Sequence, residues 1–145
     1  MLIIYQNFGY KVIVIDKYSI GEKTTGHTTA KITSQHGLFY DYLLNSYGKS
    51  FAKDYLEANE QAIQNIKDII DEENINCDFE YQNNYVYTTK KEELRAIKKE
   101  IEFVQSLGYN CEFVTETGLP FDIVGSICFK NQAQFHPLKY LFRIM

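Results

Sequence analysis

We predict the fold class of this chain from the run Lys11–Asp16, which has the sequence K-V-I-V-I-D. Four consecutive β-branched apolar residues stand between a lysine and an aspartate. A continuous run of this kind is typical of a strand covered on both faces, as in a parallel α/β sheet. The preceding residues, Met1–Tyr10, leave two structures open. Leu2–Ile4 could end a helix that Gly9 terminates, or could pair with the run as a hairpin around Gln6–Gly9.

Asp16, at the end of this run, is a candidate ligand for a nucleotide ribose. In dinucleotide-binding βαβ units an acidic residue closes the second strand, and its carboxylate accepts hydrogen bonds from the ribose hydroxyls. The alternative is an ordinary strand end at which the aspartate begins a turn. The strand by itself does not decide between the two.

The segment Ser19–Gly37 is long, polar and rich in glycine and threonine. Hydroxyls and glycine-freed N–H groups can bind phosphates or a flavin edge; a solvated loop whose threonines cap the next helix is the alternative. Within it, Gly21–Thr28 differs from the phosphate-binding pattern G-x-x-x-x-G-K-[ST] because His27 replaces the lysine. A neutral imidazole does not supply the fixed positive charge of that lysine, so a nucleotide triphosphatase is disfavoured.

Two helices follow from the spacing of apolar residues. The first is expected from about Lys49 to Asp71, with one face formed by Phe51, Tyr55, Ala58, Ala62, Ile66, Ile69 and Ile70. The second opens with a capping box at Thr89–Glu92 and ends at Gly108, in the position of a left-handed cap. Its apolar face contains Leu94, Ile97, Ile101, Val104 and Leu107.

Strands are expected around the second helix. In Phe79–Tyr87, aromatic residues alternate with polar ones, which predicts a half-buried strand or hairpin. Cys111–Thr115 and Ser126–Lys130 predict further short strands. Pro137 fits the first turn of a helix that continues from Leu138.

The composition is that of an ordinary folded protein and excludes several classes. The 145 residues are 45% hydrophobic and 23% charged, with a net charge of −4, which fits one domain, or one domain and part of another. A mildly acidic chain has no general attraction to nucleic acid or anionic lipid. No apolar run approaches the roughly 20 residues of a membrane-spanning helix.

The cysteines and histidines predict no metal site. Cys77, Cys111 and Cys128 have neither the spacing of a redox pair nor the even number of a disulfide set, so we expect buried free thiols in a reducing cytoplasm. Together with the cysteines, the three histidines form no zinc pattern.

Four segments, considered together, resemble one family. They are G-Y-K-V-I-V-I-D-K (9–17), T-T-G-H-T-T-A-K-I-T-S-Q-H-G (24–37), Y-L-E-A-N-E-Q-A-I (55–63) and N-Q-A-Q-F-H-P-L-K-Y (131–140). The sequence resembles the D-amino-acid-oxidase-like FAD-dependent oxidoreductases. Within them it is most similar to the subgroup whose full-length members often carry a C-terminal Rieske iron–sulfur domain. The resemblance covers essentially the whole chain.

The resemblance implies residues that bind FAD. Asp16 corresponds to the acid that holds the adenosine ribose. The turn that approaches the pyrophosphate corresponds to Thr24, Thr25 and Gly26. The segment along the ribityl chain and the flavin ring corresponds to Thr28, Thr29, Ala30, Lys31 and Ile32. Gln35 and His36 would lie near the flavin face. No metal ligand and no catalytic residue follow from the resemblance.

The resemblance also implies a fold. We expect an α/β chain with a partial Rossmann-type FAD-binding domain (1–76), part of an α+β substrate domain (77–135) and the start of a return helix (136–145). The family opens with a strand and a G-x-G-x-x-G turn into a helix, and the sequence contains neither the first strand nor this glycine turn. We therefore interpret the chain as an internal fragment of a larger flavoenzyme.

The expected function is FAD-dependent oxidation of a small amino acid or other amine, in which a hydride passes to the flavin. Each charge-assisted hydrogen bond contributes roughly 1.5–3 kcal/mol. Without those of the glycine turn, we expect FAD binding by this chain to be weak or absent, and we expect no activity from this chain alone. We also expect a cytoplasmic location, self-association and no nucleic-acid partner. The alternatives are a non-catalytic remnant and a small interaction module.

Overall fold

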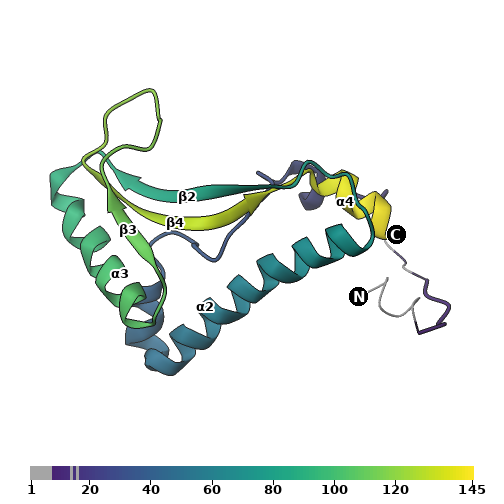
Figure 1. The fold of residues 1–145 in the computed structure, drawn as a ribbon, viewed down its shortest axis with the longest axis horizontal. Helices are drawn as coiled ribbons and strands as arrows, with labels where there is room; N and C mark the ends of the chain where they lie inside the picture. The colour runs from purple at the N-terminus through teal and green to yellow at the C-terminus, as the bar shows by residue number, and fades with distance from the viewer. Residues whose placement is uncertain (1–7, 14, 16) are drawn as a thin grey trace.

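The centre of the fold is an antiparallel sheet with β4 at its middle (Figure 1). The computed structural model describes residues 8–13, 15 and 17–145. β4 (Gly125–Gln134) pairs along its whole length with β2 (Glu80–Thr88). Its other edge pairs first with β3 (Cys111–Val114) and then with β1 (Lys31–Ile32). The described chain is therefore a mixed α/β structure with an antiparallel sheet.

The predicted strands around the second helix are confirmed. The aromatic alternation of Phe79–Tyr87 forms β2, and β3 and β4 occupy the two later runs. β4 extends beyond the predicted end at Lys130 because a bulge carries the pairing onward. At this bulge Asn131 has a left-handed φ of 56°, and the register with β2 shifts between Gln82 and Asn84.

The long helix α2 (Tyr40–Glu72) confirms the predicted helix and adds an unpredicted segment before it. Gly48, with φ 87° and ψ 170°, breaks the helical geometry between the two parts. These angles are accessible almost only to glycine. The buried face of the main part contains Ala52, Leu56 and Ile63, whereas Phe51 is exposed, so the core face is rotated from the predicted one.

The second helix, α3 (Leu94–Ser106), begins later than the sequence predicts. A 3-10 turn, Lys91–Glu93, precedes it. The predicted capping box at Thr89–Glu92 is wrong: Lys90, which is extended, is the N-cap of the 3-10 turn, and no side chain caps that turn. The Thr88 hydroxyl donates to the Glu93 carboxylate (2.5 Å) and accepts from the Lys90 N–H (3.0 Å).

The end of α3 is as predicted. Gly108 has φ 90°, and its N–H donates to the carbonyl of Gln105 (2.9 Å) while the Tyr109 N–H donates to that of Val104 (3.4 Å). These two bonds form a Schellman cap. The final helix, α4 (Pro137–Ile144), begins at the predicted proline.

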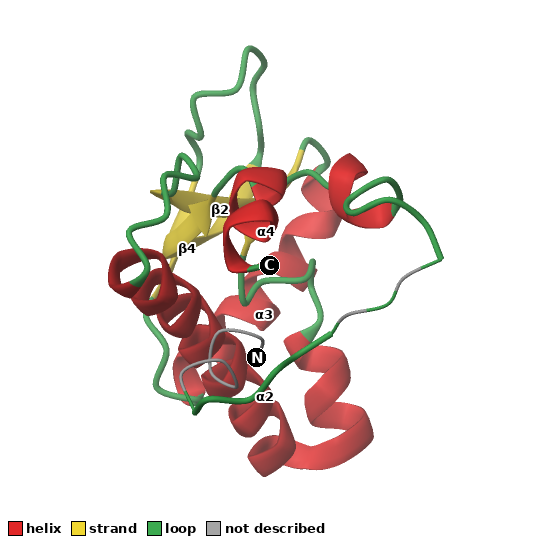
Figure 2. Ribbon diagram, turned by 90° about the vertical axis from the view of Figure 1, so that its right-hand side faces the viewer, coloured by secondary structure: helices red, strands yellow, loops and turns green. Residues whose placement is uncertain are grey.

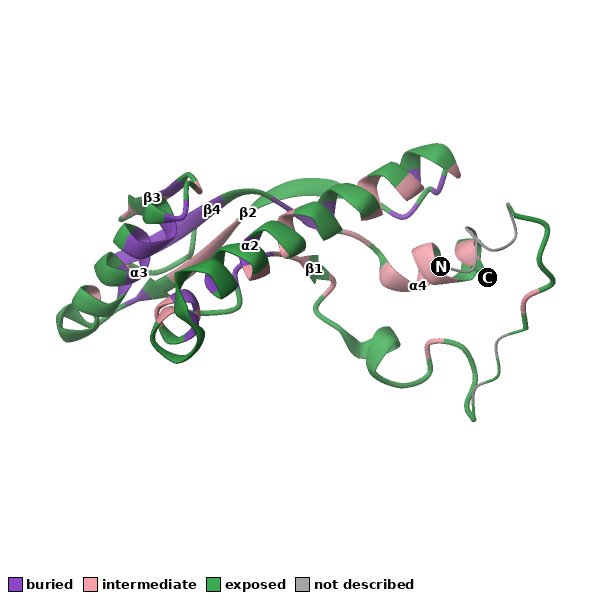
Figure 3. Cartoon of the chain, turned by 90° about the horizontal axis from the view of Figure 1, so that it is seen from below, coloured by how far each residue is buried: buried purple, intermediate pink, exposed green. Residues whose placement is uncertain are grey.

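Two hydrophobic clusters hold the elements together. α2 runs below the sheet, and α3 lies at the end away from α4 (Figure 1). The larger cluster joins α2, α3, β3 and β4, where the buried residues gather (Figure 3). The smaller cluster consists of Ile70, Ile75 and Cys77, and α4 packs on it through Tyr140 and Ile144. The proposed boundary at residues 76 and 77 stays a prediction.

The strand predicted at Lys11–Asp16 is not formed by the described residues of that run. Lys11–Ile13 and Ile15 belong to no strand, and Ile13 and Ile15 are 84% and 90% exposed. A β-branched run becomes a strand only when a neighbouring strand supplies ladder hydrogen bonds, and the sheet does not extend to this run. Val14 and Asp16, and the alternatives for residues 1–7, lie outside the described residues.

Candidate functional site

A cavity of about 630 Å³ lies at the end of the sheet that carries α4. Figure 2 is viewed from this end, with α4 in front of the strands. Three segments that are far apart in the sequence line the cavity: Gly26, Thr28 and Ala30; Asp78, Phe79 and Glu80; and Gln134, Phe135, His136, Pro137 and Leu138. It therefore joins the threonine-rich loop to the end of β4 and the first turn of α4.

Main-chain pairing brings these segments together. Lys31 lies opposite Gln134 in the β1–β4 pair, and the N–H of Phe135 donates to the carbonyl of Ala30 (3.2 Å). Ala30 has a φ of 61°, which turns the chain from the loop into β1. The threonine-rich loop is therefore fixed to the sheet at its C-terminal end.

The Gly21–Gly26 turn is closely packed. A β-carbon added to Gly26 would overlap the carbonyl oxygen of Gly21. Since Gly26 lines the cavity, it presents bare main chain there. The N–H of Gly26 donates to the carbonyl of Lys23 (3.1 Å).

The opposite wall is acidic. The Asp78 carboxylate pairs with the Lys139 ammonium group (2.7 Å), and the side-chain amide of Gln134 donates to the Glu80 carboxylate. Glu80 is the first residue of β2 and lies opposite Gln134 of β4, and Asp78 lies two residues before it. Since Lys139 neutralises Asp78, Glu80 leaves this wall with a net negative charge, which favours hydrogen-bond donors over phosphate.

His136 connects this wall to α4. Its main-chain N–H donates to the carbonyl of Cys77 (2.6 Å), and its Nδ1 accepts from the N–H of Lys139 (3.4 Å). The imidazole therefore caps the first turn of α4. Burial raises the pKa of the Cys77 thiol, which keeps it in the neutral form.

Three of the residues predicted to bind FAD line the cavity: Gly26, Thr28 and Ala30. The others that the structure describes lie in the same loop or in β1 without lining it: Thr24, Thr25, Thr29, Lys31 and Ile32. Asp16 lies outside the described residues.

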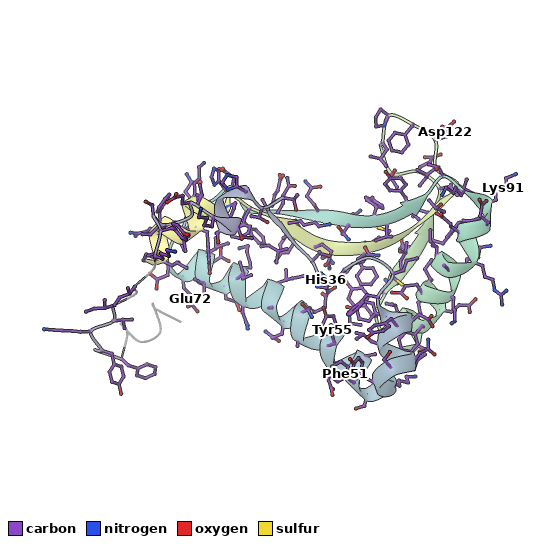
Figure 4. The ribbon with its side chains drawn as sticks, turned by 180° about the vertical axis from the view of Figure 1, so that it is seen from behind. His36, Phe51, Tyr55, Glu72, Lys91 and Asp122 are labelled. Carbon is purple, nitrogen blue, oxygen red and sulfur yellow. The ribbon has the colours of Figure 1, made fainter. Side chains whose placement is uncertain are left out.

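Gln35 and His36 lie away from this cavity. Gln35 is buried, and its Oε1 accepts from the side-chain amide of Asn84 (2.6 Å). His36 is exposed and lies beside Tyr55 of α2, with ring centroids 6.1 Å apart (Figure 4). Neither residue lines the cavity.

Sequence reasoning predicted a strand and a return helix at the other two lining segments, but it assigned no cofactor-binding role to them. The Q-F-H-P segment was visible as a motif, so its contribution could have been anticipated. Asp78–Glu80 carry no motif, and they reach the cavity only because β2 pairs with β4 in this register.

Comparison with known proteins identifies the family. Residues 4–145 match the family described as FAD dependent oxidoreductase (DAO). The chain belongs to this family. It is also 38% identical over 133 residues to YhfW of Bacillus subtilis (strain 168), which is named as a Rieske 2Fe-2S iron-sulfur protein. That alignment covers 92% of this chain and 26% of the relative. No solved structure matches the chain.

In this member of the FAD-dependent oxidoreductase family, the near match to a triphosphate-binding loop has a different geometry. Within it, Thr24–His27 forms a short 3-10 turn, and the Nδ1 of His27 lies 2.9 Å from the carbonyl oxygen of Lys23. The imidazole is therefore engaged within the turn.

A further expectation concerns the cysteines of this family member. Its three cysteines are buried and free, as predicted. Among residues 8–13, 15 and 17–145, no group of three or more His, Cys, Asp or Glu side chains could hold a metal ion. No helix among them is long and apolar enough to cross a membrane.

Proposed function

We propose that this chain forms part of the FAD site of an oxidoreductase that acts on an amino acid or another amine. Membership of the family supports the cofactor. One observation carries the location: the cavity joins the Gly26–Ala30 loop to Gln134–Leu138, two segments that also carry the sequence resemblance. The chain spans about a quarter of the relative it matches. We therefore propose the amine substrate for the whole protein and only part of the FAD site for this chain.

The chemistry of the cavity wall favours the hydroxyl-bearing part of FAD. Gly26 offers bare main chain and Thr28 offers a hydroxyl, while Asp78 and Glu80 accept hydrogen bonds on the other side. These groups fit a ribityl chain or the N–H edge of a flavin. Because Lys139 neutralises Asp78, the Glu80 carboxylate supplies the negative charge that would repel a pyrophosphate. We therefore assign the cavity to the ribityl and flavin portion. Asp16 remains the proposed ligand of the adenosine ribose.

The residues of this chain would bind and orient the cofactor. FAD, when bound, supplies the two-electron chemistry that accepts a hydride. The main-chain hydrogen bond between Phe135 and Ala30 would hold the Gly26–Ala30 loop at a fixed distance from Gln134–Leu138. The short loop between Gly26 and β1 would shield one side of the cofactor from water.

The test is a titration of FAD with the full chain, followed by flavin fluorescence and calorimetry. We expect saturable but weak binding, because the sequence contains no G-x-G-x-x-G turn for the pyrophosphate. Thr28→Val should weaken it about two- to tenfold, the value of one neutral hydrogen bond. Thr115→Val is the matched control, because Thr115 is exposed just after β3, and it should bind like the wild type.

Two results would contradict the proposal. Absence of saturable binding by the folded wild-type chain would favour the interaction-module alternative. Equal weakening by Thr28→Val and Thr115→Val would show that binding does not involve the cavity. Circular dichroism of each variant checks that the fold is retained.

A further inference from the structure

We propose that Leu138 is a positioning residue, which holds the Gly21–Gly26 turn against the cavity. This inference rests on the proposed function of the cavity. Leu138 lies in the first turn of α4, is half-buried and lines the cavity itself. Leu138 is not among the residues that the sequence resemblance assigns to FAD.

The start of α4 is firmly placed. The N–H of His136 donates to the carbonyl of Cys77 (2.6 Å), just before β2. One residue earlier, the N–H of Phe135 donates to the carbonyl of Ala30 (3.2 Å). Leu138 follows two residues after His136, so its main chain has a defined position relative to the sheet.

The hydrogen bonds in and beside the Gly21–Gly26 turn, in contrast, join residues that are close in the sequence. The N–H of Glu22 donates to the carbonyl of Ser19 (3.0 Å), and the N–H of Gly26 donates to that of Lys23 (3.1 Å). Bonds between residues three apart define the shape of a turn, but they do not place it against the rest of the molecule. A contact from another element has to do so.

Leu138 makes that contact. A β-carbon added to Gly21 would overlap the Cδ2 methyl of Leu138, and one added to Gly26 would lie 3.9 Å from the same methyl. A β-carbon on Gly26 would also overlap the Gly21 carbonyl. The Leu138 methyl therefore lies against Gly21, and the Gly21 carbonyl lies against Gly26. The van der Waals surface of this one side chain sets the depth at which the turn approaches the cavity.

The first test is a double-mutant cycle on the chain without FAD. Hydrogen exchange of a peptide spanning residues 19–30 reports the opening of the turn. Leu138→Ala should speed this exchange severalfold, and Leu138→Met should restore it. Gly21→Ala should speed it about ten- to hundredfold, because the new methyl overlaps Leu138 and the φ of Gly21 is +74°.

In the Leu138→Ala background, Gly21→Ala should have a smaller effect, because only the cost of the positive φ remains. Ile144→Ala is the control: it lies on α4 but packs on the Ile70, Ile75 and Cys77 cluster. It should destabilise α4 without coupling to Gly21. Strictly additive effects of the Gly21 and Leu138 substitutions would overturn the proposal.

The second test separates this inference from the proposed function. Leu138→Ala should lower the affinity for FAD more than Ile144→Ala does, with Leu138→Met near the wild type. If the wild-type chain binds FAD and Leu138→Ala binds it equally well, the positioning role is overturned and the FAD site stands. If the cycle shows coupling but the wild type binds no FAD, Leu138 still positions the turn and the proposed function fails.

Discussion

The buried carboxylate of Glu100 provides a sharp test of how this fold is held together. Glu100 lies on α3 and is 1% exposed, yet it accepts hydrogen bonds from the N–H groups of Tyr40 (2.7 Å) and Asp41 (2.9 Å) at the start of α2. α2 has no side-chain cap from its own N-terminal residue, Phe39. Glu100 thus caps a helix that begins 60 residues earlier.

The predicted perturbation is Glu100→Ala. It leaves two main-chain donors unsatisfied at the helix start, and each buried unsatisfied donor costs about 1–3 kcal/mol. The free energy of unfolding should therefore fall by about 2–6 kcal/mol, a large part of the total for a domain of this size. Urea unfolding followed by circular dichroism measures this. The matched control is Glu102→Ala, on the exposed face of α3, which should change stability by less than about 0.5 kcal/mol.

The pH dependence supplies a second readout. Burial raises the pKa of Glu100 above its ordinary value of 4.5, and the hydrogen bonds from Asp41 and Tyr40 oppose this shift only in part. Between the unfolded and the higher folded pKa, the folded chain keeps a proton that the unfolded chain has lost. Its stability therefore decreases as pH rises through this interval. In Glu100→Gln this decrease should be absent. Equal stability of Glu100→Ala and Glu102→Ala would refute the capping role.

Two more predictions concern the helix cap and the exposed N-terminal run. Gly108→Ala should lower stability by about 1–2 kcal/mol, because alanine is strained at a φ of 90°; the urea midpoint measures this, and an unchanged midpoint would contradict it. The exposed side chains of Ile13 and Ile15 predict self-association, so the double substitution to lysine should shift light scattering toward the 17.0 kDa monomer. A wild-type chain that is already monomeric at high concentration would rule this out.

Much of the secondary structure could be predicted from the sequence because its causes are local. The alternation in Phe79–Tyr87 produced β2, and the apolar spacing from Leu94 produced α3. Gly108 and Pro137 marked a helix end and a helix start through their own backbone preferences. These signals act within a few residues, so neighbouring sequence is sufficient to identify them.

The candidate site was predictable on one side only. The loop wall, Gly26–Ala30, was identified through a motif, whereas the acidic wall formed by Asp78 and Glu80 was not. The positions of those two carboxylates follow from the register between β2 and β4. Register is a property of two strands together, and neither strand encodes it alone.

By itself, the sequence determined α3, α4, the main part of α2, the strands β2 and β3, the glycine cap at Gly108 and the family to which the chain belongs. Only the tertiary structure decided that β4 is the central strand, that Glu100 caps α2, and that Leu138 touches the glycine turn. It also decided that Lys11–Ile13 and Ile15 are outside the sheet, although their composition is that of a strand. The physical reason is the same in each case. A helix forms its main-chain hydrogen bonds within one segment of the chain. A strand, a distant cap or a packing contact requires a partner residue that is remote in the sequence.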